Sequence, residues 1–96
     1  MHGLIGKISA AAGKRDELID ILLAGLKDMP GCISYVVAKD PADPAAIWIT
    51  EIWVSEADHK ASLQLPSVQA AIGKGRALIA SMTQIALTEP VGGHGL

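Results

Sequence analysis

The chain has no phenylalanine and no asparagine, and its only cysteine is Cys32. A single cysteine excludes an internal disulfide and a thiolate cluster for zinc or iron–sulfur. The three histidines, His2, His59 and His94, lie far apart without the spacing of metal ligands, so the sequence predicts no metal site unless distant residues converge in the fold. No apolar run approaches the roughly 20 residues of a membrane span, and the first residues lack the basic and apolar regions of a signal peptide.

Charge of one sign is not in excess either. Eight Lys and Arg face ten Asp and Glu, for a net charge of -2. Nucleic-acid binding needs a positive field, so we expect no nucleic-acid partner. Because the sequence also has no predicted membrane span or signal peptide, we expect a soluble cytoplasmic protein that does not bind membranes. The 96 residues are 50% hydrophobic and 19% charged, which is typical of one small globular domain. We assign residues 1–91 to that domain and residues 92–96 to a flexible glycine-rich tail.

Hydrophobic spacing and turn signals divide the chain into strands and helices. The predicted elements are a strand over His2–Ala10, a helix over Lys14–Met29, strands over Cys32–Lys39 and Ala46–Val54, a short helix capped by Ser55, a helix from Pro66 to Ile79, and a strand over Met82–Glu89. The two longer helices, over Lys14–Met29 and from Pro66 to Ile79, occupy the positions of the two helices in the ferredoxin-like βαββαβ order. The sequence therefore predicts an α+β fold, with an antiparallel sheet and helices on one face only.

The predicted strand over residues 46–54 is largely apolar on both faces. One face carries Ile47, Ile49, Glu51 and Trp53, and the other carries Trp48, Thr50, Ile52 and Val54. Helices cover only one face of such a sheet, so the other needs a second cover. A short chain also buries only a limited core. We therefore predict a homodimer, with Trp48 at its interface.

Several short motifs follow one another in the order and spacing of a known family. They are Pro30-Gly31-Cys32-x-Ser34-Tyr35, Asp40-Pro41-x-x-Pro44, Glu51-Ile52-Trp53, Ser55-Glu56-Ala57, Leu65-Pro66 and Glu89-Pro90-Val91. Together they resemble the antibiotic biosynthesis monooxygenase domain, particularly its small quinol-monooxygenase-like members. The resemblance covers about residues 3–91.

This resemblance implies a dimer of ferredoxin-like protomers, each with a cavity between its sheet and its helices. It also implies oxidation of phenolic, quinol or anthrone substrates by O2 without a metal or flavin, and the chain has neither a GxGxxG motif nor a P-loop. Many members carry a histidine nine residues after the strand tryptophan, where this chain has Ser62. Some members, including those that degrade haem, use an asparagine that this chain lacks.

His59 is the candidate catalytic base, because imidazole exchanges protons near neutral pH. A short helix that turns His59 towards the cavity would bring Ser62 with it, three residues on, as a possible hydrogen-bonding partner of the substrate. Trp53 is predicted to wall the cavity and to offer an indole N–H. The alternatives are that His59 faces solvent and that Trp53 is an ordinary core residue.

Four further residues are candidates for binding or catalysis. A buried Glu51 would need a partner or a raised pKa, and Arg76 could pair with it or contact an anionic substrate oxygen. Tyr35 could hydrogen-bond a substrate oxygen, and His94 lies in a tail that could fold over the cavity. The alternatives are solvated surface charges for Glu51 and Arg76, a structural role for Tyr35, and a disordered tail.

Two other functions are compatible with the same residues. The scaffold could be a non-catalytic module that binds small apolar ligands or serves a stress response, because a fold does not determine a function. His59 could instead be an axial ligand of haem. We expect His2 to be a surface residue at a strand end, and Cys32 to be a small buried apolar residue.

Overall fold

The computed structural model describes residues 1–96. In chain order its elements are β1 (His2–Ala10), α1 (Arg15–Gly25), β2 (Cys32–Lys39), β3 (Ala46–Trp53), α2 (Glu56–Ser62), α3 (Pro66–Gly75), a 3₁₀ turn η1 (Arg76–Leu78) and β4 (Ile79–Thr88). All four predicted strands and all three predicted helices are present. No helix is long and apolar enough to cross a membrane.

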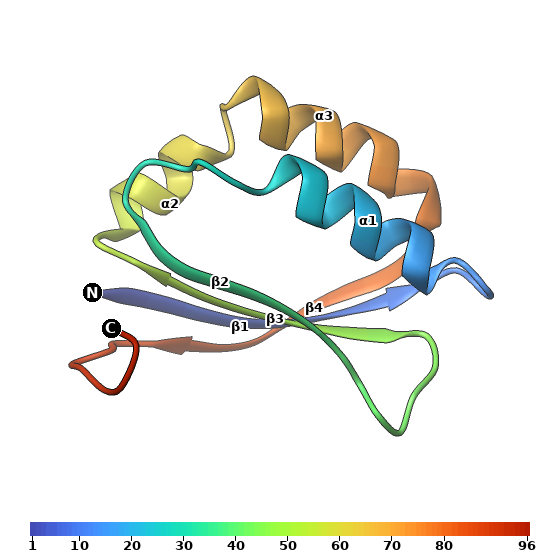
Figure 1. The fold of residues 1–96 in the computed structure, drawn as a ribbon, viewed down its shortest axis with the longest axis horizontal. Coiled ribbons are helices and arrows are strands. Elements are labelled where there is room, and N and C mark those ends of the chain that lie inside the picture. The colour runs from blue at the N-terminus through green and yellow to red at the C-terminus, as the bar shows by residue number, and fades with distance from the viewer.

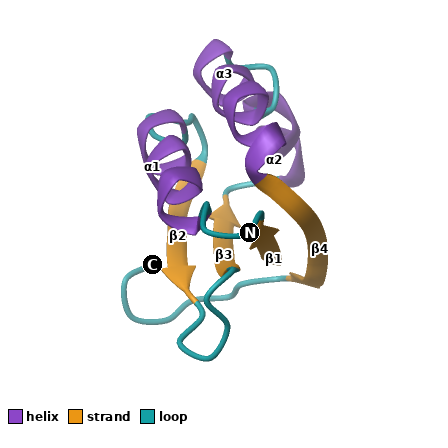
Figure 2. Ribbon diagram, turned by 90° about the vertical axis from the view of Figure 1, so that its right-hand side faces the viewer, coloured by secondary structure: helices purple, strands orange, loops and turns teal.

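The four strands form one antiparallel sheet in the order β2-β3-β1-β4. The three helices lie on the same face of this sheet, as Figures 1 and 2 show from two directions. This arrangement is the predicted ferredoxin-like α+β fold. It places β1 and β3 in the middle and leaves β2 and β4 as the two edges.

Three predicted boundaries are wrong by several residues, and one of them is the end of α3, which lies at Gly75 rather than at Ile79. Helix α1 ends at Gly25 rather than at Met29, and Asp28 has a left-handed backbone with φ 54°. The chain turns there because Met29 is buried against the sheet instead of continuing the helix. Strand β4 begins at Ile79 rather than at Met82, because Ile79 already pairs with Ala10 of β1.

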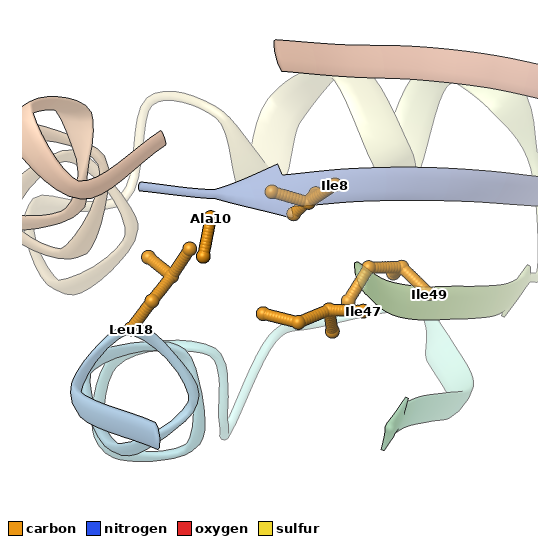
Figure 3. Close-up of a cluster of buried hydrophobic side chains, with 5 residues drawn as sticks. All are labelled: Ile8, Ala10, Leu18, Ile47 and Ile49. Carbon is orange, nitrogen blue, oxygen red and sulfur yellow. The ribbon is translucent and has the colours of Figure 1, made fainter. Parts of the chain in front are cut away.

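The main core cluster lies between α1 and the two central strands. It contains Ile8 and Ala10 of β1, Leu18 of α1, and Ile47 and Ile49 of β3, whose side chains converge in Figure 3. Leu18 and Ile47 are fully buried. Burial of such apolar surface is the main force that holds the helix on the sheet.

A second core cluster lies towards the other end of the sheet. It contains Leu4 of β1, Met29 of the loop after α1, Trp53 of β3 and Val68 of α3. Cys32, which was expected to be buried, is only partly buried and packs against the edge of this cluster. Trp53 thus joins the sheet to α3 just below α2, and this junction supports the candidate site.

The opposite face of the sheet, which we call the outer face, has no helix over it (Figure 2). Trp48 lies on this face, where its Nε1 donates a hydrogen bond to Asp40 Oδ2 at 3.0 Å. The Lys7 ammonium lies 5.2 Å from the centroid of the Trp48 ring. Val36 and Val54 are at least half exposed, at 50% and 59%. The outer face is therefore partly apolar and open.

Candidate functional site

Helix α2 is held in place by a well-formed N-terminal cap. The Ser55 Oγ accepts a hydrogen bond from the Asp58 backbone N–H at 3.2 Å and donates one to Asp58 Oδ2 at 3.0 Å. Ser55 is a favourable N-cap residue because its side chain satisfies a free N–H of the first turn. His59 follows directly on this capped turn. The cap therefore fixes where α2 begins, and the packing of α2 on β3 places His59 over the sheet.

The His59 imidazole lies above a buried carboxylate. His59 Nε2 is 3.7 Å from Glu51 Oε1, and the two side chains are only 22% and 16% exposed. This separation is longer than a hydrogen bond, so the interaction is an attraction between charges when His59 is protonated. Trp53 Nε1 donates a hydrogen bond to the same Glu51 oxygen at 3.1 Å. Its ring centroid is 5.3 Å from that of His59.

Burial changes the acidity of two groups beneath His59. The pKa of Glu51 is raised by desolvation, although the Trp53 hydrogen bond and the nearby His59 and His2 oppose that rise. The pKa of Tyr35 is raised above the usual tyrosine range, first by burial and then by the Glu51 charge. Tyr35 therefore keeps its proton, so its hydroxyl is able to donate a hydrogen bond to a bound group.

Two adjoining cavities open beside His59, between the sheet and α2. The larger, the outer cleft, has a volume of about 740 Å³ and is bordered by α2 and the ends of β1 and β4. The smaller, the inner cavity, has a volume of about 190 Å³ and lies over the middle of β1. Leu4, His59 and Gln84 line both. His59 therefore stands where the two cavities meet.

Three of the predicted site residues come together at the inner cavity. Tyr35, Glu51 and His59 arrive from β2, β3 and α2, and all three line it. Tyr35 and Glu51 are paired across the antiparallel strands, which brings their side chains to the same face. The alternative in which His59 and Glu51 are solvated surface charges does not agree with their burial.

The other four predicted residues do not line either cavity. Trp53 is 1% exposed and covered by the second core cluster, so it supports Glu51 from below and is not a cavity wall. Ser62 is buried and its Oγ donates to the His59 carbonyl at 2.6 Å, so its hydroxyl is already occupied. Arg76 is exposed beside Ile79 and makes no ion pair with Glu51. His94 is in the exposed C-terminal segment, away from both linings.

Two residues of the site were not expected from the sequence. His2 lines the outer cleft, and its ring is stacked on His59 with centroids 5.8 Å apart, so it is not a simple surface residue. The alternation of His2 with Leu4 could have revealed this, because residues two apart share a strand face. Gln84 lines both cavities, but a register shift between β1 and β4 hides its direction in the sequence. No group of three or more His, Cys, Asp or Glu side chains is placed to hold a metal ion.

Fold and site together define a small α+β protein with a mixed apolar and polar cavity beside a His–Glu pair. The sequence model of the family described as antibiotic biosynthesis monooxygenase matches residues 1–74. The chain belongs to the antibiotic biosynthesis monooxygenase family. No curated protein matches the chain at a significant level.

Solved structures agree with this membership. A structure from Chloroflexus aurantiacus, whose name places it in the same family, has 62% identity and a TM-score of 0.93, with 97% of this chain and 95% of that chain covered. A structure from Deinococcus radiodurans with a similar name has 27% identity and a TM-score of 0.79, over 97% and 95% of the two chains. A third, from Nitrosomonas europaea, has 12% identity and a TM-score of 0.86, over 96% and 100% of the two chains, and shows that the fold persists at low identity. Family and neighbours together support a monooxygenase activity.

The buried carboxyl predicts a pH-dependent stability. An unfolded glutamate titrates near 4.5, whereas folded Glu51 titrates higher because it is desolvated. The folded state therefore binds more protons between these two values, and this group's contribution to the free energy of unfolding falls as pH rises through them. Glu51→Gln keeps an acceptor for Trp53 and is expected to remove that loss.

Urea unfolding of wild type and Glu51→Gln, from about pH 4 to about pH 8, tests this expectation. The stability of the variant relative to wild type should increase with pH and then level off. Glu17→Gln changes an exposed carboxyl on α1 and is the matched control. A difference between Glu51→Gln and wild type that does not vary with pH would contradict the prediction.

Proposed function

We propose that the protein is a cofactor-independent monooxygenase that oxidises a small phenolic, quinol or anthrone-like compound with O2. The observation that carries this proposal is the Glu51–His59 pair at the junction of the two cavities. Membership of the family supports the class of reaction. The residues supply a base, a buried counter-charge and an apolar space for an aromatic ring.

The proposed reaction begins with proton transfer from a substrate hydroxyl or acidic C–H to His59. Glu51 lies on the Nε2 side of the imidazole and stabilises the imidazolium that forms, which leaves Nδ1 to accept the proton. Trp53 holds the Glu51 oxygen in position through its N–H. Tyr35 remains protonated and donates a hydrogen bond to the developing oxygen anion.

The anion is electron-rich and transfers one electron to O2, which forms an organic radical and superoxide. Their recombination makes a C–O bond and a peroxide, and loss of water leaves a carbonyl. A phenol C–H or an anthrone CH2 is thus converted to C=O, one oxygen atom enters the product and the other leaves as water. Because the substrate supplies all four electrons, the step needs no external reductant. Ile8 and Ile49 place apolar surface beside the radical pair, and the bound substrate itself would have to fill the open side of the inner cavity to exclude water.

Oxygen uptake tests this proposal. Reduced quinols and anthrones would be supplied with chelator present, autoxidation subtracted, and the product mass measured after reaction under isotopically heavy O2. We expect uptake above background and one labelled oxygen in the product. Hydrogen peroxide with no labelled product would mean an oxidase, and no uptake with any of these compounds would favour the non-catalytic ligand-binding module.

We also propose that a second copy of the chain covers the outer face. Apolar side chains gather there with no helix over them, namely Ile5, Val36, Trp48, Ile52 and Val54. A second sheet against this face would remove their surface from water. Light scattering on the eluting protein should give twice the 10.0 kDa chain mass. A mass of one chain across the concentration range would contradict the dimer.

A further inference from the structure

Gly6 lies in the middle of β1 on the face that the helices cover. It alternates with Leu4 and Ile8, which are both buried on that face. Its partners in the sheet are Ile49 of β3 and Gln84 of β4. One side chain is therefore missing from the layer between sheet and helices, at the centre of the sheet.

Neither the backbone nor the packing requires glycine at this position. Gly6 is not among the glycines with positive φ, in contrast to Gly31 at φ 79°. A Cβ added to Gly6 would meet only the Thr83 carbonyl oxygen, at an ordinary contact distance of 3.6 Å. A Cβ on Gly3, by comparison, would collide with the Thr88 hydroxyl.

The nearby β-bulge does not explain Gly6 either. The register shift between β1 and β4 leaves Ile85 of β4 without a partner, so the extra residue is on β4 and not at Gly6. Glycine weakens the interior of a strand, and it often marks a place where a ligand approaches the backbone. The space left above Gly6 is therefore the feature that glycine provides.

That space is the inner cavity. Unlike the enclosed apolar cavity of roughly 150 Å³ that binds benzene, it is open to solvent on one side and lined by polar as well as apolar side chains, but its volume of about 190 Å³ is on the same scale. Ile8 and Ile49 supply apolar walls, and Glu51 and His59 line the same cavity. The cavity is thus large enough for one aromatic ring, with a hydroxyl placed near the Glu51–His59 pair.

We propose that Gly6 is the floor on which a single aromatic ring of the substrate lies, and that its missing side chain sets the largest ring that enters the inner cavity. The ring is that of a phenol, whose hydroxyl is directed to Glu51 and His59. Any further part of the substrate remains in the outer cleft. This inference rests on the proposed function for the chemistry of the ring, and on the geometry alone for the role of Gly6.

Binding of para-ethylphenol, measured by calorimetry without turnover, tests the inference. Wild type should bind the probe, and Gly6→Ala should bind it about tenfold more weakly, since one methyl group changes affinity on that scale. Gly6→Val should not bind it. Gly73→Ala is the matched control, because Gly73 has nothing within 4 Å of an added Cβ and lies outside both cavities. Its affinity should equal that of wild type.

A thermal melt separates loss of space from loss of fold. Alanine is preferred to glycine inside a strand, so Gly6→Ala should melt at the wild-type temperature or above while binding weakens. Equal affinity in wild type and both Gly6 variants would overturn the inference, and so would failure of wild type to bind. If Gly6→Val does not fold, the Gly6→Ala result decides alone. If binding weakens from wild type to Gly6→Ala to Gly6→Val but no O2 is taken up, the role of Gly6 stands and the monooxygenase proposal is rejected. If O2 is taken up at the same rate by wild type and by both Gly6 variants, the monooxygenase proposal stands and the role of Gly6 is rejected.

Discussion

Replacing His59 with alanine is expected to lower the rate of O2-dependent substrate oxidation by about 100- to 10,000-fold, the range that a positioned base contributes. His59 is the one histidine paired with a buried carboxylate, and it stands at the junction of the two cavities. Without its imidazole the substrate has no proton acceptor held above Glu51. The rate of O2 uptake at saturating substrate measures the loss.

Two controls make the result specific. His94→Ala removes an exposed histidine and should leave the rate unchanged. His59→Gln keeps a polar side chain of similar size and should be as inactive as His59→Ala, because an amide cannot accept the proton. Full activity in either His59 variant would eliminate His59 as the base.

Replacing Trp53 with alanine is expected to lower the free energy of unfolding by about 3–5 kcal/mol. Trp53 is 1% exposed and packs with Leu4, Met29 and Val68, so truncation leaves a large cavity where β3 meets α3. It also removes the hydrogen-bond donor to Glu51. Natural domains are stable by only about 5–15 kcal/mol, so a large part of the stability would be lost.

Urea unfolding at one fixed protein concentration gives this value, because dimerisation would make stability depend on concentration. Trp53→Phe keeps a six-membered ring but loses the N–H and part of the packing, so its smaller loss sets an upper limit on the contribution of the Glu51 contact. Trp48→Ala on the half-buried outer face should lower stability by less, about 1–2 kcal/mol. Equal losses for Trp48→Ala and Trp53→Ala would show that Trp53 is not the main support of the site.

The order of elements could be predicted from the sequence because each element carries its own local signal. Side chains in the strands alternate between the two faces of the sheet, and Ser55 marks the start of α2 because its hydroxyl caps the first turn. The ends of α1 and β4 could not be predicted in this way. They depend on Met29 being buried under the sheet and on Ile79 pairing with Ala10, which are contacts between distant parts of the chain.

The candidate site shows the same division. Residue type made His59 the candidate base, and strand alternation placed Glu51 and Trp53 on one face. Arg76 was the partner predicted for Glu51, and the pairing with His59 was not expected, because the fold brings α2 and not η1 over that carboxylate. The role of Trp53 changed for a related reason, since the packing of α3 on the sheet covers its ring.

The sequence by itself determined the family, through the resemblance of its motifs, and also the class of fold and the residue types available for chemistry, which follow from short-range spacing and from composition. The tertiary structure alone decided that His59 and Glu51 form a pair, that His2 stacks on it, and that Gly6 leaves a cavity beside it. Each of these depends on strand register and on which helix covers which strand. Strand register and helix placement are determined by the packing of the whole core, so they cannot be predicted from a local sequence pattern.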